Sequence, residues 1–165
     1  MAEAVVHADG RLDLAGRLWR VALGRGGVRA DKQEGDGATP AGLLPLRRVL
    51  YRADRIPPPR CAVPREPIAP NDGWCDDAGH PDYNRKVRLP HPARCEELWR
   101  SDALYDVVGV LGWNDSPIER GRGSAIFLHV ARAGLAPTEG CIALPLPELQ
   151  ALLAAGMTAL RVLPG

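Results

Sequence analysis

Glycine and proline are the features that most constrain the fold of this chain. Its 165 residues include 18 glycines and 16 prolines, spread along the whole sequence. Both residue types interrupt helices and favour turns, yet their total stays below the level typical of disordered chains. Short apolar runs lie between these turn residues, as in β-rich proteins. We therefore expect a mainly β structure with many turns and long ordered loops.

The apolar runs and the turn signals that bound them define the expected elements. The Asp9-Gly10 pair separates two short apolar runs, which is typical of a hairpin, and residues 3–32 resemble an antiparallel start. Two short helices are expected at residues 92–100 and 147–155, each with a proline near its start. Residues 54–92 are predicted to be a long ordered loop that serves as a lid. Strands are expected at residues 4–6, 11–14, 17–23, 28–32, 43–52, 105–111, 124–130 and 158–163.

Length and charge exclude several classes of protein. The length favours a single domain over residues 1–165, large enough to bury a hydrophobic core. The formal net charge of +1 gives no electrostatic footprint for nucleic acid. No apolar stretch approaches the ~18 residues of a membrane helix, and no signal peptide is visible at the N-terminus. We expect a monomer that neither binds nucleic acid nor inserts into a membrane.

The cysteines give no strong metal signal. The chain has four of them and no Cys-x-x-Cys pair, namely Cys61, Cys75, Cys95 and Cys141. Cys61, Cys75, His80 and His91 are too irregularly spaced to resemble the usual zinc ligands. We therefore expect neither a bound metal nor a cofactor. If Cys141 stays a free thiol, the other three cysteines can form at most one disulfide.

One histidine and one cysteine carry the clearest chemical signal. His129 lies in an apolar strand, and the glycine and proline that follow it allow the chain to turn back and bring Cys141 within hydrogen-bond reach. A neighbouring imidazole raises the thiolate fraction of a cysteine and later protonates a leaving amine. The backbone N–H groups around Gly140 and Cys141 are candidates for binding an oxyanion. The alternative is a core cysteine beside a surface histidine, since cysteine is among the most often buried residues.

Two motifs together resemble the YkuD-type L,D-transpeptidases. The first, Thr138-Glu139-Gly140-Cys141-Ile142 after the His129 strand, is similar to the family signature, in which His, Ser or Thr, Gly and the nucleophilic Cys occur in this order. The second, the segment 35–42 (Gly-Asp-Gly-Ala-Thr-Pro-Ala-Gly), is similar to the family's Gly-Asp-Gly-x-Thr-Pro-x-Gly loop. The two motifs span residues ~30–145, and residues 54–92 match a short divergent branch.

The resemblance implies a fold and a reaction. The fold would be a small β-sandwich with two short helices, and its lid would cover the catalytic residues Cys141, His129 and Gly140. The partner would be the stem peptide of peptidoglycan. Cys141 would form a thioester with loss of a terminal D-amino acid, and the amine of a second stem would resolve it to a cross-link. That substrate implies the periplasm or cell envelope, although the chain shows no signal peptide.

Two positions depart from the family pattern. Glu139 stands where the family usually has His, and Ala143 stands where it tends to have Arg. A carboxylate facing the thiol would raise its pKa, so we expect Glu139 to turn away or to bind a cation such as Arg132 or a substrate amine. We expect Arg85 and Arg88 to bind the stem carboxylate instead, with Arg132 as the second candidate.

The indole of Trp74, in the irregular region 54–92, could form a wall of the cleft, and it could equally well anchor the loop. The expected substrate-binding residues are Trp74, Tyr83, Asn84, Arg85, Arg88, Arg132, Thr138 and Glu139. Three other functions remain open beside transpeptidation. Water as the acceptor would make the protein an L,D-carboxypeptidase or hydrolase. Glu139 and Ala143 also suit an inactive wall-binding β-domain, and a sortase-like enzyme is a more remote possibility.

Overall fold

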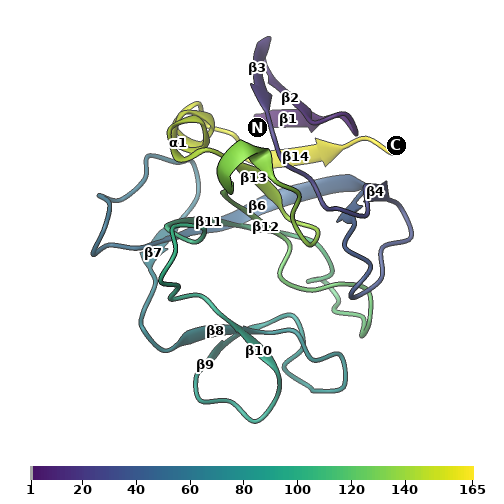
Figure 1. Ribbon diagram of the computed structural model, residues 1–165, viewed down its shortest axis with the longest axis vertical. Helices are drawn as coiled ribbons and strands as arrows, with labels where there is room; N and C mark the ends of the chain where they lie inside the picture. Colours follow the sequence, from purple (N-terminus) through teal and green to yellow (C-terminus); the bar gives the residue numbers. More distant parts are fainter. Residues whose placement is uncertain (1) are drawn as a thin grey trace.

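The computed structural model describes residues 2–165 and is built mainly from β-strands (Figure 1). One large mixed sheet has the strand order β13-β12-β11-β6-β14-β1-β2-β3, and β7 pairs with β6 beside this path. Its strands are β1 (Glu3–Val6), β2 (Arg11–Leu14), β3 (Arg17–Arg20), β6 (Gly42–Tyr51), β7 (Arg65–Pro67), β11 (Val107–Leu111), β12 (Phe127–Val130), β13 (Ile142–Leu144) and β14 (Ala159–Val162).

Two smaller sheets and the helical segments complete the fold. A three-stranded antiparallel sheet, which we call the small sheet, has the order β10-β8-β9 and lies apart from the large sheet (Figure 1). The remaining pair, β4 and β5, is parallel. The bounds are β8 (Asp72–Cys75), β9 (Lys86–Arg88), β10 (Cys95–Glu97), β4 (Val28–Arg29), β5 (Thr39–Pro40), helix α1 (Leu146–Ala154) and the 3-10 turn η1 (Ala133–Leu135). The predicted mainly β, sandwich-like architecture is confirmed.

The large sheet curls until its two ends meet. Just beyond β3, the N–H of Ala22 donates to the carbonyl of Ala143 in β13 at 2.8 Å, and the N–H of Ala143 donates back to Ala22 at 3.0 Å. The bonds continue along the same seam, where the N–H of Thr138 donates to Leu23 at 3.0 Å. Backbone N–H and carbonyl groups along this seam, which would be unpaired at an open sheet edge, are therefore hydrogen-bonded within the chain.

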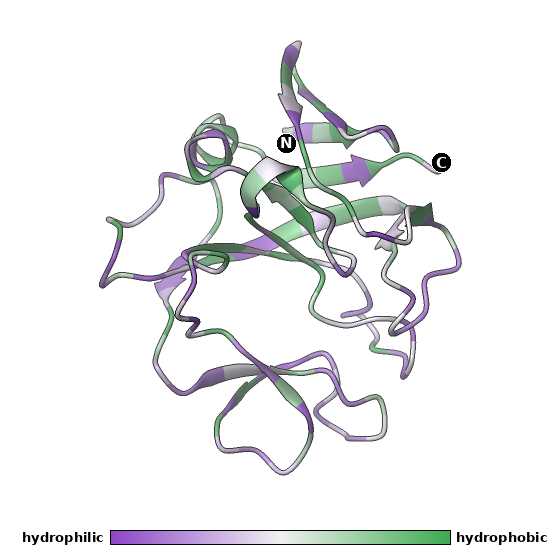
Figure 2. Ribbon diagram, in the orientation of Figure 1, coloured by the Kyte–Doolittle hydropathy of each residue, from purple (hydrophilic) through white to green (hydrophobic). Residues whose placement is uncertain are grey.

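The two faces of the large sheet belong to two hydrophobic cores, because side chains alternate along a strand. Leu128 and Ile142 pack with α1 in the first core. Phe127 and Cys141 lie in the second core, together with Trp74 of the small sheet. Figure 2 shows that hydrophobic residues concentrate in the strands of the large sheet, whereas the outer loops are mostly hydrophilic. The large sheet is therefore covered on both faces.

Most of the expected elements are confirmed. The Asp9-Gly10 hairpin forms with Val6 opposite Leu12, and the later strands and the helix at 147–155 occur within a few residues of their expected bounds. Residues 28–29 differ from the expected antiparallel start, since β4 pairs in parallel with β5. The described residues contain no helix of the length and hydropathy that a bilayer crossing requires.

The prediction of a helix at residues 92–100 is wrong. Within this segment Cys95–Glu97 forms strand β10, where Cys95 pairs with Cys75 and Glu97 with Gly73 of β8. A proline at the start of a segment suits an extended chain as well as a first helical turn. Pairing with β8, which the local sequence does not reveal, decides between them. The predicted loop at 54–92 likewise contains β7, β8 and β9.

The packing of α1 on the first core predicts that replacing a leucine of α1 costs more stability than replacing an exposed leucine. Leu152 is fully buried, whereas Leu18 on β3 is 65% exposed. We expect Leu152→Ala to lower the free energy of unfolding by about 2–5 kcal/mol, because the substitution leaves a cavity. Leu18→Ala should change it by less than about 0.5 kcal/mol. Urea unfolding followed by circular dichroism measures both, and equal losses would contradict this packing.

Candidate active site

The candidate nucleophile and base come from two neighbouring parallel strands. In the register of β12 and β13, Leu128 lies opposite Ile142 and His129 opposite Ala143. Cys141 immediately precedes β13, so its side chain shares a face of the sheet with His129. The two side chains line one cavity of about 550 Å³. The fold therefore brings together the pair that the sequence predicted.

The Cys141 thiol is held by the backbone of the adjacent segment. It donates to the carbonyl of Ala125 at 3.3 Å and accepts the N–H of Phe127 at 3.4 Å. The pKa of Cys141 is raised to about 12, mainly by burial and also by the nearby Glu96, while the Phe127 N–H and Lys32 act in the opposite direction. The thiol is 9% exposed. At neutral pH it is therefore protonated in this state.

His129 is also neutral, and its tautomer is determined by one hydrogen bond. Its Nδ1 lies 2.8 Å from the carbonyl of Val130, which can only accept, so Nδ1 carries the proton and Nε2 keeps its lone pair. The edge of the Tyr105 ring packs against the imidazole, with 5.4 Å between the ring centroids. The pKa of His129 is lowered to about 4, mainly by burial and also by Arg100 and Arg132, against the opposing Val130 carbonyl.

The turn before Cys141 requires glycine. Gly140 has a φ of +135°, and a Cβ there would lie 2.8 Å from the carbonyl oxygen of Ala38. The hydroxyl of Thr138 bridges this turn, because it donates to the Cys141 carbonyl at 2.6 Å and accepts the Gly140 N–H at 3.1 Å. Thr138 therefore shapes the backbone of the nucleophile, and Gly140 lets that backbone lie against residues 35–42.

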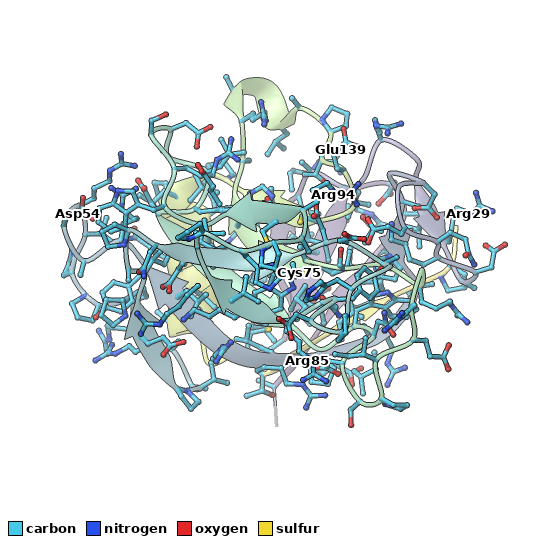
Figure 3. All side chains as sticks on the ribbon, turned by 90° about the horizontal axis from the view of Figure 1, so that it is seen from below. Arg29, Asp54, Cys75, Arg85, Arg94 and Glu139 are labelled. Atoms are coloured by element: carbon cyan, nitrogen blue, oxygen red, sulfur yellow. The ribbon has the colours of Figure 1, made fainter. Side chains whose placement is uncertain are left out.

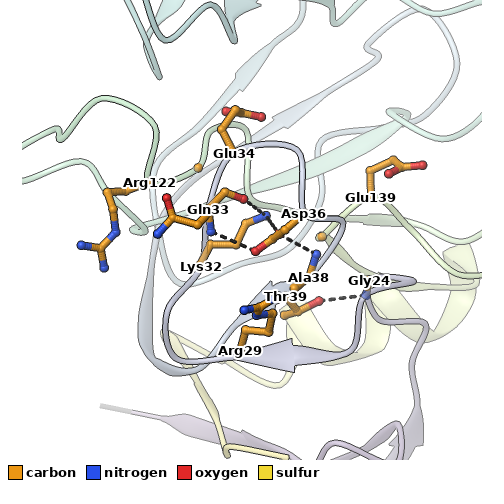
Figure 4. A network of polar contacts seen from close by, with 12 residues as sticks. Gly24, Arg29, Lys32, Gln33, Glu34, Asp36, Ala38, Thr39, Arg122 and Glu139 are labelled. Atoms are coloured by element: carbon orange, nitrogen blue, oxygen red, sulfur yellow. Dashed lines mark hydrogen bonds and ion pairs between the residues drawn. The ribbon is translucent and has the colours of Figure 1, made fainter.

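A buried ion pair organises the segment 35–42, which we call the glycine-rich loop (Figure 4). Lys32 is 3% exposed, and its ammonium lies 2.6 Å from Asp36. Asp36 also accepts the N–H groups of Gln33 and Ala38, each at 2.9 Å. Burial would raise the pKa of Asp36, but Lys32 and these two N–H groups outweigh it and hold that pKa below its usual range. Thr39 closes the loop by accepting the N–H of Gly24 at 2.9 Å.

The cavity has an acidic and a basic side that the sequence did not predict. Glu34, Asp76 and Glu96 contribute carboxylates, whereas Arg100 and Arg132 contribute guanidinium groups. The hydroxyl of Tyr105 donates to Glu96 beside the thiol. Sequence reasoning missed every residue here except Arg132, because Glu96 and Arg100 fell in the supposed helix at 92–100. No local pattern connects them to Cys141.

The predicted substrate-binding residues divide between two cavities. Arg132, Thr138 and Glu139 line the Cys141 cavity. Arg85 and Arg88 instead line a second cavity of about 630 Å³, whose lining also includes Trp74 and Phe127 but neither His129 nor Cys141. Figure 3 shows Arg85 and Glu139 on opposite sides of Cys75. The structure therefore does not bring Arg85 and Arg88 to the candidate nucleophile.

Three other predicted residues lie behind the site. The Asn84 amide oxygen accepts the Trp74 indole N–H at 2.9 Å and the Ala125 N–H at 3.1 Å. Because the Ala125 carbonyl accepts the Cys141 thiol, this amide supports the segment that holds the nucleophile. The Tyr83 hydroxyl donates to Glu34 at 2.7 Å, and burial raises its pKa. All three side chains are buried.

The two departures from the family pattern have simple structural environments. Glu139 turns outward, with its side chain 78% exposed, and pairs with Arg25 at 2.8 Å. The cation is therefore Arg25 and not Arg132, and such a surface pair contributes only ~0–1 kcal/mol to stability. Ala143 is fully buried in the seam where the large sheet closes.

The buried neutral imidazole of His129 predicts that the folded protein loses stability as the pH falls. The pKa of His129 is about 4 in the folded protein, compared with 6.5 for an unperturbed histidine. As pH falls from 6.5 to 4, the unfolded chain takes up a proton that the folded chain does not, which costs about 1.4 kcal/mol per pH unit. Relative to wild type, His129→Asn should flatten this dependence, as measured by urea unfolding between neutral pH and pH 4. His7→Asn, on the β1–β2 turn, is the matched control, and an unchanged slope in His129→Asn would contradict the assignment.

Comparisons with known proteins show the family of this chain. The family model YkuD, described as the L,D-transpeptidase catalytic domain, matches residues 3–159. A search of curated proteins finds no match. The matched residues include both cavity-lining strands, the glycine-rich loop and the Gly140-Cys141 turn. The chain therefore belongs to the YkuD family of L,D-transpeptidase catalytic domains.

Proposed function

We propose that this protein is a peptidoglycan L,D-transpeptidase with Cys141 as its nucleophile and His129 as its base. The observation that carries the proposal is the shared cavity, in which a thiol and an imidazole with a free Nε2 lone pair lie on one face of β12 and β13. Membership of the family supports acyl transfer on stem peptides. The outward position of Glu139 removes one argument for an inactive domain.

In the first half-reaction, the Cys141 proton moves to Nε2 of His129 as the sulfur attacks the stem carbonyl. Both groups are neutral at rest, so the ion pair forms only with bound substrate. The N–H of Cys141 is the oxyanion donor we propose, because the Gly140 N–H already donates to Thr138. The imidazolium then protonates the departing D-amino acid, and a thioester remains.

In the second half-reaction, the amine of another stem attacks the thioester carbonyl. His129 accepts a proton from this amine as the C–N bond forms, and the thiolate leaves and is reprotonated. Water in place of the amine would give the carboxypeptidase reaction. The acceptor therefore decides between the two activities, and both use the same Cys141 and His129.

Charges around the cavity support a substrate that carries both amines and carboxylates. Arg132 is exposed at the rim and Arg100 lies deeper, so we propose that these two residues bind the stem carboxylates. Glu34 and Asp76 face the same space and suit a substrate ammonium group. This assignment replaces Arg85 and Arg88, which line the other cavity.

Acylation tests the proposed nucleophile directly. Incubation with a carbapenem should add one intact antibiotic mass to the wild-type protein, because the β-lactam carbonyl traps the thiol as a stable acyl-enzyme. Cys141→Ala should show no adduct, and Cys61→Ala is the matched control that should still acylate. An adduct that persists in Cys141→Ala, read by intact-protein mass spectrometry, would rule out Cys141. Purified sacculi then separate the activities, since new dimers indicate transpeptidation and shortened monomers indicate hydrolysis.

The carboxylate beside the thiol should control the pH dependence of Cys141 alkylation. Glu96 raises the pKa of Cys141, so Glu96→Gln should shift the rise in iodoacetamide labelling of this residue to lower pH. Its neighbour Glu97 is exposed on β10, and Glu97→Gln should leave the profile unchanged. Peptide mass spectrometry of labelled Cys141 gives the rate at each pH. Coincident profiles for Glu96→Gln and wild type would show that Glu96 does not act on the thiol.

A further inference from the structure

A second group of sulfur and imidazole side chains lies outside the Cys141 cavity, on the small sheet. Cys75 is the last residue of β8 and Cys95 the first of β10, and the two lie directly opposite each other in the register. His91 precedes Cys95 on the same loop. The two sulfur atoms and one imidazole nitrogen all lie within 4.8 Å of one another. We call Cys75, His91 and Cys95 the thiol–imidazole cluster.

The dimensions of this cluster suit a tetrahedral zinc ion. Zinc binds thiolate sulfur at about 2.3 Å and imidazole nitrogen at about 2.0–2.1 Å, so its ligand atoms lie roughly 3.5–3.8 Å apart. The observed spread is within about 1 Å of that range. Soft thiolates together with an imidazole select zinc over the alkaline-earth cations, which prefer oxygen ligands.

The hydrogen bonds of His91 assign its tautomer, and a metal bound at Nδ1 would replace the Ala93 N–H as the partner of that nitrogen. The Ala93 N–H donates to Nδ1 at 3.1 Å, so Nδ1 has the lone pair and Nε2 carries the proton. Nε2 lies 2.9 Å from the carboxylate of Asp82. A carboxylate on the far nitrogen is the arrangement usually found behind metal-bound histidines. The thiol of Cys95 lies 3.5 Å from the Ala93 carbonyl, so the thiol and Nδ1 converge on one residue.

His80 lies next to His91 and is the candidate that we consider for the fourth ligand. The ring of His80 lies 4.8 Å from that of His91, and His80, Asp82 and His91 form a second group whose ligand atoms also lie within 4.8 Å.

We propose that Cys75, His91 and Cys95 bind a structural zinc ion, with Asp82 orienting His91 and His80 nearest the fourth position. The metal would join β8 to β10 behind the Cys141 cavity. Asp76 and Glu96, the chain neighbours of the two cysteines, line that cavity, so the ion would hold its acidic wall. The proposed site departs from the expectation of no metal, and it contains Cys95 in place of Cys61 among the ligands that the sequence considered. It stands independently of the transpeptidase proposal.

Metal content tests the proposal on the full chain. Reduced wild-type protein, dialysed against zinc and then against buffer, should retain one zinc per chain by elemental mass spectrometry. Cys75→Ser, Cys95→Ser and His91→Ala should lose it, whereas Cys61→Ser and Cys141→Ala should retain it. Asp82→Asn should weaken zinc binding by about 10- to 100-fold, as expected for a residue behind a ligand. Retention by the Cys75→Ser, Cys95→Ser double variant would overturn the site.

Cobalt substitution provides a measurement that does not depend on whether the variants fold. Wild-type protein loaded with Co²⁺ should show thiolate-to-cobalt charge-transfer absorption together with the intense visible bands of a tetrahedral ion. Zinc should also raise the melting temperature of the wild-type protein, because it binds the folded state. Absence of zinc and of these bands, or a Cys75–Cys95 disulfide in protein prepared with zinc and alkylated without reduction, would overturn the proposal.

Discussion

The hydrogen bonds between Ala22 and Ala143 are the constraint on which the rest of the site depends. They join the segment after β3 to β13, so the large sheet closes on itself. Closure fixes the Thr138–Cys141 turn between the seam and the glycine-rich loop. Gly140 then lies against Ala38 at a distance that admits no Cβ. The position of the candidate nucleophile therefore follows from the closure of the sheet, and the short turn alone does not determine it.

The thiol of Cys141 and the imidazole of His129 are both neutral in the candidate site. Burial raises the pKa of the Cys141 thiol and lowers the pKa of the His129 imidazole, so neither group is charged at neutral pH. A preformed thiolate–imidazolium pair would need compensation for two buried charges. In the mechanism that we propose, the proton transfer is coupled to the arrival of the carbonyl and its oxyanion. The same burial protects the resting thiol from adventitious electrophiles.

The small sheet connects the candidate active site to the thiol–imidazole cluster. Residues on its strands alternate between two sides, so Glu96 reaches the cavity while its neighbour Cys95 points toward Cys75. A zinc ion that joined β8 to β10 at the two cysteines would therefore restrict the positions of Asp76 and Glu96, which are next to these cysteines in the chain. Asn84 and Trp74 provide a second connection, because their hydrogen bonds reach the Ala125 backbone that holds the thiol.

The sequence by itself determined the mainly β architecture, the hairpin at Asp9-Gly10, the helix near the C-terminus and the pair Cys141 and His129. Each of these rests on local information, namely turn residues, apolar periodicity or a short motif. Only the tertiary structure decided that Cys95–Glu97 is a strand, that Glu96 and Arg100 line the cavity, and that Arg85 and Arg88 line another. It also brought Cys95 beside Cys75 and His91. These outcomes depend on strand pairing between distant segments. The residue pattern of one strand does not show which other strand it pairs with.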